Sequence, residues 1–180
     1  MELIQEPLPG VKILRPFVYE DDRGYFVKTF HEAQLKQHDI EINIKEEFYT
    51  TSASGVVRGM HFQIPPHAHQ KFITCVSGKV LDVVLDLRKE SPTYGQHASF
   101  ELSEENHYIA YIPIGFAHGF LSQKPNSALL YKTDCVYTPE SDQGILWNSF
   151  GHKWEINDLN VIISDRDRQH VALENFISPF

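Results

Sequence analysis

The sequence predicts an all-β protein, a jelly-roll β-barrel with one or two short helices. Short apolar alternations recur at intervals of about 8 to 12 residues between turn-forming residues, a spacing typical of sandwiches and barrels rather than of alternating strand and helix units. Gly and Pro, 10 of each, are scattered along the 180 residues and mark no linker. Residues 1–180 are therefore expected to form a single domain.

The expected strands are, in order, residues 11–14, 25–30, 42–51, 56–63, 72–76, 80–87, 98–102, 107–112, 119–122 and 128–137. Residues 72–76 and 80–87, joined by Ser77-Gly78-Lys79, are expected to form a hairpin. Alternation along the second of these strands puts Asp82 and Asp86 on one face and four leucine and valine side chains on the other. Residues 31–38 are expected to be helical, and a second short helix is expected after Ser164.

Composition excludes several classes of protein. Sixteen Lys and Arg against 24 Asp and Glu give a formal net charge of −8, whereas duplex nucleic-acid binders carry a basic face. No signal-peptide pattern opens the chain and no apolar run approaches about 18 residues, so the protein is expected to be cytoplasmic and free of membrane. Cys75 and Cys135 lie in separate apolar stretches and are expected to be buried free thiols.

Ten histidines raise the question of a metal site. The run from Pro113 to His118 matches the PxGxxH half of a metal-binding cupin, and His67-Ala68-His69 resembles the HxH half, so a metal-dependent cupin enzyme is an alternative. The carboxylate that should follow the HxH half is missing, and Lys71 would repel a divalent cation there. No metal is therefore expected.

A second group of residues suggests proton transfer without a metal. Residues 58–63, Arg-Gly-Met-His-Phe-Gln, read as a strand with His61 and Gln63 on the same face. Imidazole titrates near neutral pH and becomes an effective base when a carboxylate orients it. His61 is thus a candidate proton acceptor if its face lines a cavity.

The whole set of motifs resembles the dTDP-4-dehydrorhamnose 3,5-epimerase family. The resemblance rests on segments in the family's order, namely residues 22–26 (DRGYF), 55–63 (GVVRGMHFQ), 71–88, 91–95 (SPTYG), 112–120 (IPIGFAHGF), 130–133 with Tyr137, 144–148 (GILWN) and 163–167 (ISDRD). It implies a cupin jelly roll, a homodimer, a nucleotide-sugar substrate, and no metal or other cofactor.

The resemblance also implies roles for individual residues. The base falls on His61, its orienting carboxylate on Asp167, the proton donor on Tyr131 and an oxyanion-stabilising ammonium on Lys71. The implied substrate-binding residues are Arg23, Lys28, Glu46, Phe48, Arg58, Gln63, His118, Tyr137, Asp142 and Arg166. Arg58 is the expected partner of the diphosphate. Lys28, Glu46 and Phe48 depart from the family, which usually has Glu, Gln and Asn at these places.

The expected reaction is epimerisation at C3 and C5 of dTDP-4-dehydro-6-deoxy-D-glucose, which gives dTDP-4-dehydro-L-rhamnose for dTDP-rhamnose biosynthesis. Both C–H bonds lie α to the C4 ketone, so a base on one face and an acid on the other suffice. Three alternatives remain beside it. A relative can epimerise only C3 or C5, or isomerise the ketone, of another 4-keto sugar; the metal-dependent cupin would use His67, His69 and His118; and a non-catalytic domain would only bind a sugar nucleotide.

Overall fold

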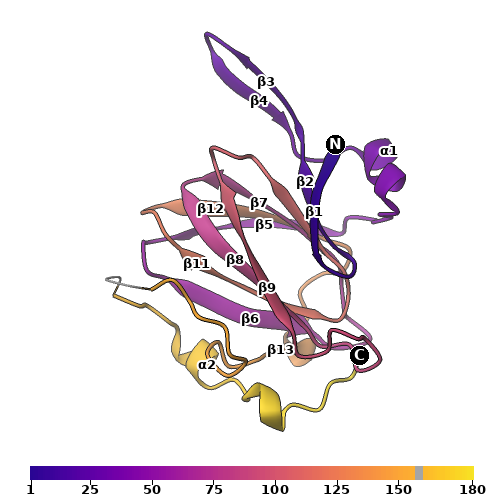
Figure 1. The fold of residues 1–180 in the computed structure, drawn as a ribbon, viewed down its shortest axis with the longest axis vertical. Coiled ribbons are helices and arrows are strands. Elements are labelled where there is room, and N and C mark those ends of the chain that lie inside the picture. Colours follow the sequence, from indigo (N-terminus) through magenta and orange to yellow (C-terminus); the bar gives the residue numbers. More distant parts are fainter. Residues whose placement is uncertain (157–159) are drawn as a thin grey trace.

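The alternating strands of the sequence fold into two antiparallel sheets that face each other across an apolar core (Figure 1). The computed structural model describes residues 1–156 and 160–180. One sheet has the order β1 (Glu2–Leu8), β2 (Val11–Arg15), β10 (Ile109–Ile112), β7 (Lys71–Ser77), β12 (Ser127–Thr133) and β5 (Glu46–Ser52). The other has the order β13 (Asp142–Gly144), β6 (Val57–Gln63), β11 (Phe116–Ser122), β8 (Lys79–Asp86) and β9 (His97–Ser103). The predicted all-β jelly roll is confirmed.

Three apolar layers explain why the central strands are apolar on both faces. The inner core between the sheets joins Ile73 and Leu129 of one sheet to Val84 and Phe120 of the other. The C-terminal residues 161–180 cover the outer face of the five-stranded sheet, where Leu81, Val83, Leu85 and Leu87 lie. The helix α1 (Glu32–Leu35), which leads into the 3-10 turn Lys36–His38, and its flanking residues Phe30, Ile40 and Ile42 cover the outer face of the other sheet. The alternation predicted for β8 is therefore confirmed, and both of its faces are buried.

The predicted hairpin of residues 72–76 and 80–87 is wrong. β7 pairs with β10 and β12, whereas β8 pairs with β11 and β9 in the opposite sheet. The chain crosses between the sheets at Gly78, which has a φ of +76° and leaves no room for a Cβ atom against Ser127. Two consecutive strands that are apolar on both faces bury more apolar surface when they lie in different layers than when they pair with each other.

Other differences concern the ends of the chain and of the strands. β1, β3 (Phe17–Asp21) and β13 were not expected, and the strands predicted at 42–51 and 128–137 are Glu46–Ser52 and Ser127–Thr133. Both helices are where they were predicted, α1 with its 3-10 turn and α2 (Asp165–Arg168) after Ser164. Cys75 is buried and free as expected, but Cys135 is only half-buried because it follows the end of β12. In the part of the chain described, no helix is long and apolar enough to cross a membrane.

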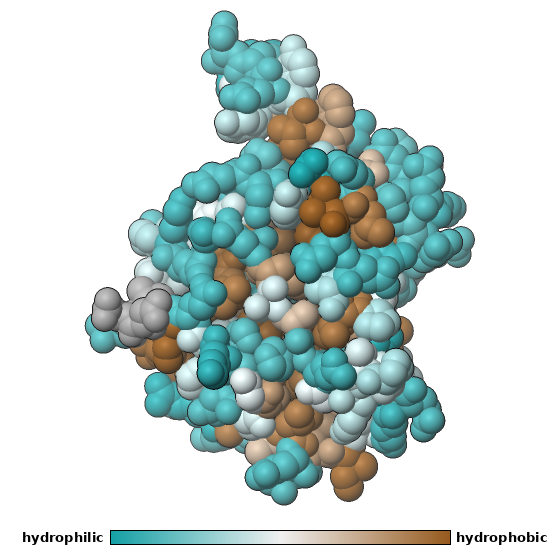
Figure 2. Space-filling view, viewed as in Figure 1, coloured by the Kyte–Doolittle hydropathy of each residue, from teal (hydrophilic) through white to brown (hydrophobic). Residues whose placement is uncertain are grey.

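The hairpin of β3 and β4 (Gly24–Lys28) projects away from the barrel (Figure 1). Its aromatic side chains Phe17, Tyr19, Tyr25 and Phe26 are exposed. Figure 2 shows a hydrophilic tip and a hydrophobic surface where the hairpin leaves the barrel. Phe17, Tyr19 and Phe26 lie on one face of the hairpin and Tyr25 on the other. Exposed large aromatic side chains of this kind are typical of an interaction surface.

Candidate active site

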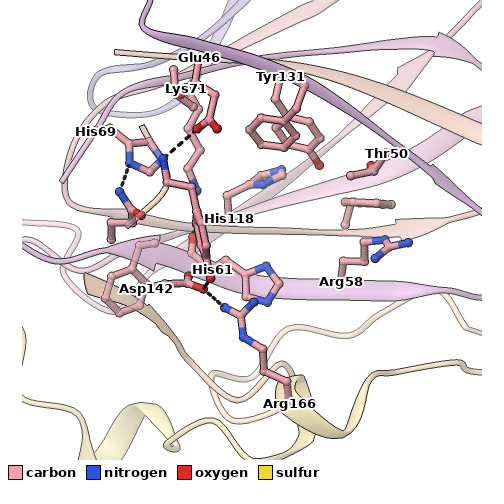
Figure 3. Close-up of a pocket in the computed structure, with 16 residues that line it drawn as sticks. Glu46, Thr50, Arg58, His61, His69, Lys71, His118, Tyr131, Asp142 and Arg166 are labelled. Atoms are coloured by element: carbon pink, nitrogen blue, oxygen red, sulfur yellow. Dashed lines mark hydrogen bonds and ion pairs between the residues drawn. The ribbon is translucent and has the colours of Figure 1, made fainter. Parts of the chain in front are cut away.

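One cavity of about 270 Å³ opens between the two sheets, and most of the predicted site residues line it (Figure 3). Its wall consists of Glu46, Phe48, Thr50, Arg58, His61, Phe62, Gln63, His69, Lys71, His118, Phe120, Tyr131, Thr133, Tyr137, Asp142 and Arg166. His61 comes from β6 in the five-stranded sheet, whereas Tyr131 comes from β12 in the six-stranded sheet. The cavity therefore lies between these two side chains, on opposite walls (Figure 3).

His61 is oriented by a buried carboxylate from the C-terminal segment. Its Nε2 lies 2.8 Å from Asp167 Oδ1, and Asp167 Oδ2 accepts the backbone N–H of Gly59 at 3.0 Å. Asp167 is held in α2, where its own N–H donates to the hydroxyl of Ser164. Since Asp167 is only 4% exposed, it is not the solvated surface residue that its charged neighbours in sequence would suggest. Since Nε2 contacts the carboxylate, Nδ1 is the ring nitrogen of His61 that makes no bond to Asp167.

Gly59 brings this carboxylate close to the base. Its φ is +132°, and a Cβ atom there would lie 2.5 Å from the Cα of Gly119 on β11. Only glycine allows the two strands to approach this closely. The Arg-Gly-Met-His motif thus joins a close strand contact at Gly59 to a hydrogen bond that fixes Asp167.

The pKa values of the pair favour a neutral base beside an ionised carboxylate. Burial lowers the pKa of His61 below its ordinary value of 6.5, although Asp167 opposes this effect. Burial alone would raise the pKa of Asp167, but the imidazoles of His170 and His61 and the N–H of Gly59 hold it far below its ordinary value of 3.8. At neutral pH, His61 can therefore accept a proton.

Tyr131 is held on the opposite wall by aromatic contacts. Its ring stacks on Phe48 of β5, with centroids 4.8 Å apart and an interplanar angle of 9°, and meets the edge of His118 at 6.0 Å. It is 7% exposed, and burial, together with the charge of Asp82, raises the pKa of Tyr131 far above 10.0. The phenol stays protonated, which is the form an acid needs.

Lys71 brings positive charge between these walls. It begins β7, and its Nζ donates to the carbonyl of His61 at 3.1 Å. Burial lowers the pKa of the Lys71 ammonium to about 8, against the opposing charges of Asp142 and Asp82. A second pair is fully buried, in which His118 Nε2 lies 2.9 Å from Asp82 Oδ2.

Polar side chains close the other end of the cavity around Tyr137. The Tyr137 hydroxyl donates to Asp142 Oδ2 at 3.1 Å, and the guanidinium of Arg166 donates to the same oxygen at 2.5 Å. The N–H of Tyr137 donates to Glu46 at 2.9 Å, while Gln63 holds the following Thr138. Arg58 lies at the opposite end, where it donates to Ser52 and to the carbonyl of Thr51 (Figure 3).

Comparison with known proteins identifies the family. Residues 5–175 match the family model described as dTDP-4-dehydrorhamnose 3,5-epimerase. The dTDP-4-dehydrorhamnose 3,5-epimerase of Shigella flexneri is 38% identical over 170 residues, which cover 93% of each chain. This chain belongs to the dTDP-4-dehydrorhamnose 3,5-epimerase family.

Solved structures of this epimerase family have the same fold. The Bacillus anthracis dTDP-4-dehydrorhamnose 3,5-epimerase, with TDP and PPi bound, superposes with a TM-score of 0.91 at 35% identity and covers 96% of this chain and 99% of its own. A dTDP-6-deoxy-D-glucose-3,5-epimerase from Legionella pneumophila, in complex with dTDP-4-keto-L-rhamnose, superposes with a TM-score of 0.93 at 30% identity and covers 98% and 94%.

Two residues expected in the epimerase site lie elsewhere in the chain. Arg23 and Lys28 belong to the projecting hairpin of β3 and β4, and neither lines the cavity. Arg23 instead pairs with Asp21 at the hairpin tip. Within one chain these cations therefore lie outside the cavity that holds His61 and Tyr131.

The ligand set of the metal-dependent alternative is not assembled. Across residues 1–156 and 160–180, the side chains of His67, His69 and His118 do not form a group of ligand atoms within 4.8 Å of one another. His67 bonds to Ser141, His69 to Gln63, and His118 to Asp82. Among the residues that the structure describes, the group with metal-ligand chemistry is His61, Asp167 and His170, which includes the predicted base.

Some residues of the epimerase cavity were not expected from the sequence as members of the site. Phe62 and Phe120 supply apolar wall, and His69 and Thr133 add polar edges. His170 lies behind Asp167, with its Nε2 3.6 Å from Oδ1. The sequence carries one signal for this placement, because His170 follows Asp167 by three residues and positions i and i+3 of a helix share a face.

Proposed function

We propose that this single-domain chain is a cofactor-independent epimerase that acts at C3 and C5 of dTDP-4-dehydro-6-deoxy-D-glucose and gives dTDP-4-dehydro-L-rhamnose, in dTDP-rhamnose biosynthesis in the cytoplasm. The observation that carries the proposal is the pairing of His61 and Asp167 on one wall of a cavity whose opposite wall holds Tyr131. The TDP and PPi bound by the Bacillus relative and the dTDP-4-keto-L-rhamnose bound by the Legionella relative support the substrate class.

The first step removes a proton α to the ketone. The Nε2 of His61 donates to Asp167, so the lone pair of Nδ1 takes the proton from C3 or C5. The C–H electron pair moves into the C–C bond next to the ketone, and the carbonyl π pair moves onto the C4 oxygen. The His61 imidazolium that forms is stabilised by the buried carboxylate of Asp167.

The second step returns a proton from the other face. Lys71, whose ammonium lies in the cavity, stabilises the enolate oxygen while it is charged. Tyr131 then donates its hydroxyl proton to the same carbon from the opposite wall, which inverts that carbon. As the carbon takes this proton, the C4 carbonyl re-forms, and the His61 imidazolium and the Tyr131 phenolate return to their neutral forms by exchanging a proton with water. The cycle therefore balances without an oxidant or reductant.

We assign the nucleotide part of the substrate to the ends of the cavity that carry guanidinium groups. Arg58 lies at one end and Arg166 at the other, and both have side chains open to solvent as well as to the cavity. A diphosphate binds well to guanidinium groups because they match its oxygens in a bidentate manner. Glu46 and Phe48, which replace the family's usual Gln and Asn, place a carboxylate and an aromatic face at the cavity wall.

We also propose a homodimer in which the β3–β4 hairpin of each subunit reaches the cavity of its partner. Support comes from the exposed aromatic side chains of the hairpin and from Arg23 and Lys28, two predicted substrate-binding cations that lie outside their own cavity. Mixing the Arg23→Ala and His61→Asn variants tests this arrangement. If subunits exchange, each mixed dimer restores one intact site, and roughly a quarter of wild-type activity returns. No recovery in mixed dimers would contradict the proposal.

The activity is tested by incubating chelator-treated protein with dTDP-4-dehydro-6-deoxy-D-glucose in D₂O and following deuterium at C3 and C5 by NMR and mass spectrometry. Incorporation at both carbons is the expected result. Incorporation at one carbon would indicate a C3 or C5 monoepimerase or a ketoisomerase, because the position of Tyr131 decides which carbon is reprotonated. Loss of exchange on chelation, with recovery on adding a metal, would favour the metal-dependent cupin. Absence of any exchange with tight binding would favour a binding domain.

A further inference from the structure

His170 faces the carboxylate that orients the base, although it does not line the cavity. It lies two residues after α2, and its Nε2 is 3.6 Å from Asp167 Oδ1. Only 12% of its side chain is exposed. Among the described residues, this buried Nε2 has no hydrogen-bond partner. A buried polar atom without a partner is costly, and the position of Nε2 beside a carboxylate is favourable only if Nε2 carries the ring proton.

The fold holds the His170 ring in this place. Gly144 on β13 pairs with His61 on β6, and a Cβ atom at Gly144 would lie 2.5 Å from the His170 ring. The residues that follow Gly144 and His170 continue this contact, because Ile145 and Val171 form an isolated β-bridge. The His170 ring meets the His61 ring edge to face, with centroids 5.5 Å apart. The glycine at 144 therefore leaves the space that His170 fills.

We propose that His170 is a positioning residue, which directs its Nε2–H at Asp167 Oδ1 and thereby fixes the carboxylate that orients His61. This inference rests on the proposed epimerase function. The other oxygen of Asp167 is already held by Gly59, and Oδ1 is shared between His61 and His170. A separation of 3.6 Å in the free enzyme shortens to a hydrogen bond in the substrate complex, as catalytic contacts commonly do.

The contact also sets the basicity of His61. A donor on Asp167 Oδ1 spreads the negative charge of the carboxylate, so less of it acts on the Nε2–H of His61. The groups that face His61 are Asp167, His170, Arg166 and Lys71. Losing the His170 donor changes none of the other three, and it concentrates charge on the oxygen that His61 touches. The pKa of His61 then rises.

Three variants separate this role from simple packing. His170→Phe keeps a ring but removes the donor, His170→Gln keeps an N–H close to the position of Nε2, and Gly144→Ala pushes the intact ring off Asp167. We expect His170→Phe and Gly144→Ala to lower kcat by about 10-fold, a part of the roughly 10²- to 10⁴-fold that a positioned base supplies, with little change in KM. His170→Gln is expected to stay within about 3-fold of wild type, since one neutral N–H donor replaces another.

NMR titration of the substrate-free protein gives a second readout that does not depend on activity. In His170→Phe, the His61 pKa is expected to rise by roughly half to one pH unit, the effect of one neutral hydrogen bond, while His170→Gln leaves it near the wild-type value. If His170→Phe and His170→Gln are equally slow and the His61 pKa is unchanged in both, His170 only packs, and the proposal is wrong. If wild type turns over no sugar but the His61 pKa moves as expected, the proposed function fails and the positioning role stands.

Discussion

The two walls of the cavity hold the proposed base and the proposed acid by different means. On the five-stranded sheet, His61 is fixed by a chain of hydrogen bonds that runs through Asp167 to Gly59 and Ser164. On the six-stranded sheet, Tyr131 is fixed by aromatic contacts with Phe48 and His118. A base that becomes charged during the reaction needs polar partners, whereas an acid that must stay protonated needs an environment that resists ionisation.

The pKa directions follow from this difference. Around His61, burial and a carboxylate act in opposite directions, so the imidazole is neutral at rest yet can accept a proton. Around Tyr131, burial and the nearby Asp82 act in the same direction, and both keep the phenol protonated. The asymmetry of the walls therefore supports the proposed roles of His61 as base and Tyr131 as acid, as contrasting environments of two titratable groups generally do.

Removing the base should have the largest effect. His61→Asn keeps a polar group of similar size but takes away the imidazole that accepts the proton. We expect kcat to fall toward the upper end of the roughly 10²- to 10⁴-fold range for a positioned base, with substrate affinity little changed. Steady-state kinetics and deuterium exchange at C3 and C5 measure the effect, and both should fall together.

The matched control for this variant is His31→Asn. His31 precedes α1 and makes no side-chain capping bond, and it lies outside the cavity. Asparagine is also a favourable residue at the start of a helix. Activity of this control should equal that of wild type. If His61→Asn still exchanged deuterium at the wild-type rate, the wall that holds His61 would not supply the base.

Lys71 connects the two walls, and its loss should have the next largest effect. It belongs to the six-stranded sheet but donates to the carbonyl of His61 on the other one. Lys71→Met should lower kcat by about 10²- to 10³-fold, the range seen when one oxyanion donor is removed. Lys71→Arg, which keeps the charge, should recover part of this loss.

The wild-type pH profile checks the same residue. His61 must be neutral, and burial lowers its pKa, so the acid limb of kcat/KM should lie below pH 6.5. Lys71 must be charged, and its pKa is lowered to about 8, so activity should fall as the pH rises through about 8. The Lys71→Met variant should lack this alkaline limb. A limb that remained in that variant would belong to another group.

Removing the hydroxyl of the acid should separate exchange from inversion. Tyr131→Phe keeps the ring stacked on Phe48 but has no proton to give. Product formation should fall by about 10²-fold, at the low end of the range expected for a positioned acid, because water in the open cavity can still protonate the enolate. Deuterium exchange from the His61 side should continue. Equal loss of exchange and product would show that Tyr131 is not a dedicated acid.

The sequence predicted the base wall better than the acid wall. The Arg-Gly-Met-His motif, the alternation along β8 and the carboxylate at Asp167 are local or motif-based signals, and each is found where it was expected. The stack of Phe48 on Tyr131 joins β5 to β12, and strand pairing between distant segments has no local signal.

The same limit explains the failed hairpin and the unexpected His170. Residues 71–86 have the turn and apolar content of a hairpin, but burial of both faces decided the pairing, and that depends on the layers formed by the rest of the chain. His170 reaches Asp167 only because Gly144 on another strand leaves room for its ring. A single sequence does not show which glycine faces which histidine.

The smallest expected effect tests whether stacking alone positions the acid. Phe48→Ala removes the ring that lies parallel to Tyr131 and leaves the hydroxyl in place. An aromatic pair contributes about 0.5–1.5 kcal/mol, so kcat should fall by roughly 2- to 10-fold and the free energy of unfolding by a similar energy. Product formation should fall more than deuterium exchange, because only the acid is loosened.

Tyr49→Ala is the matched control, since Tyr49 is the next residue on β5, is 70% exposed and does not line the cavity. It should change neither rate. A Phe48→Ala enzyme with normal inversion would mean that burial under His118 is enough to hold Tyr131, and that the aromatic contact at Phe48 serves the substrate instead. A selective rise in KM for the nucleotide sugar would then accompany the unchanged kcat, because Phe48 is 42% exposed at the cavity wall.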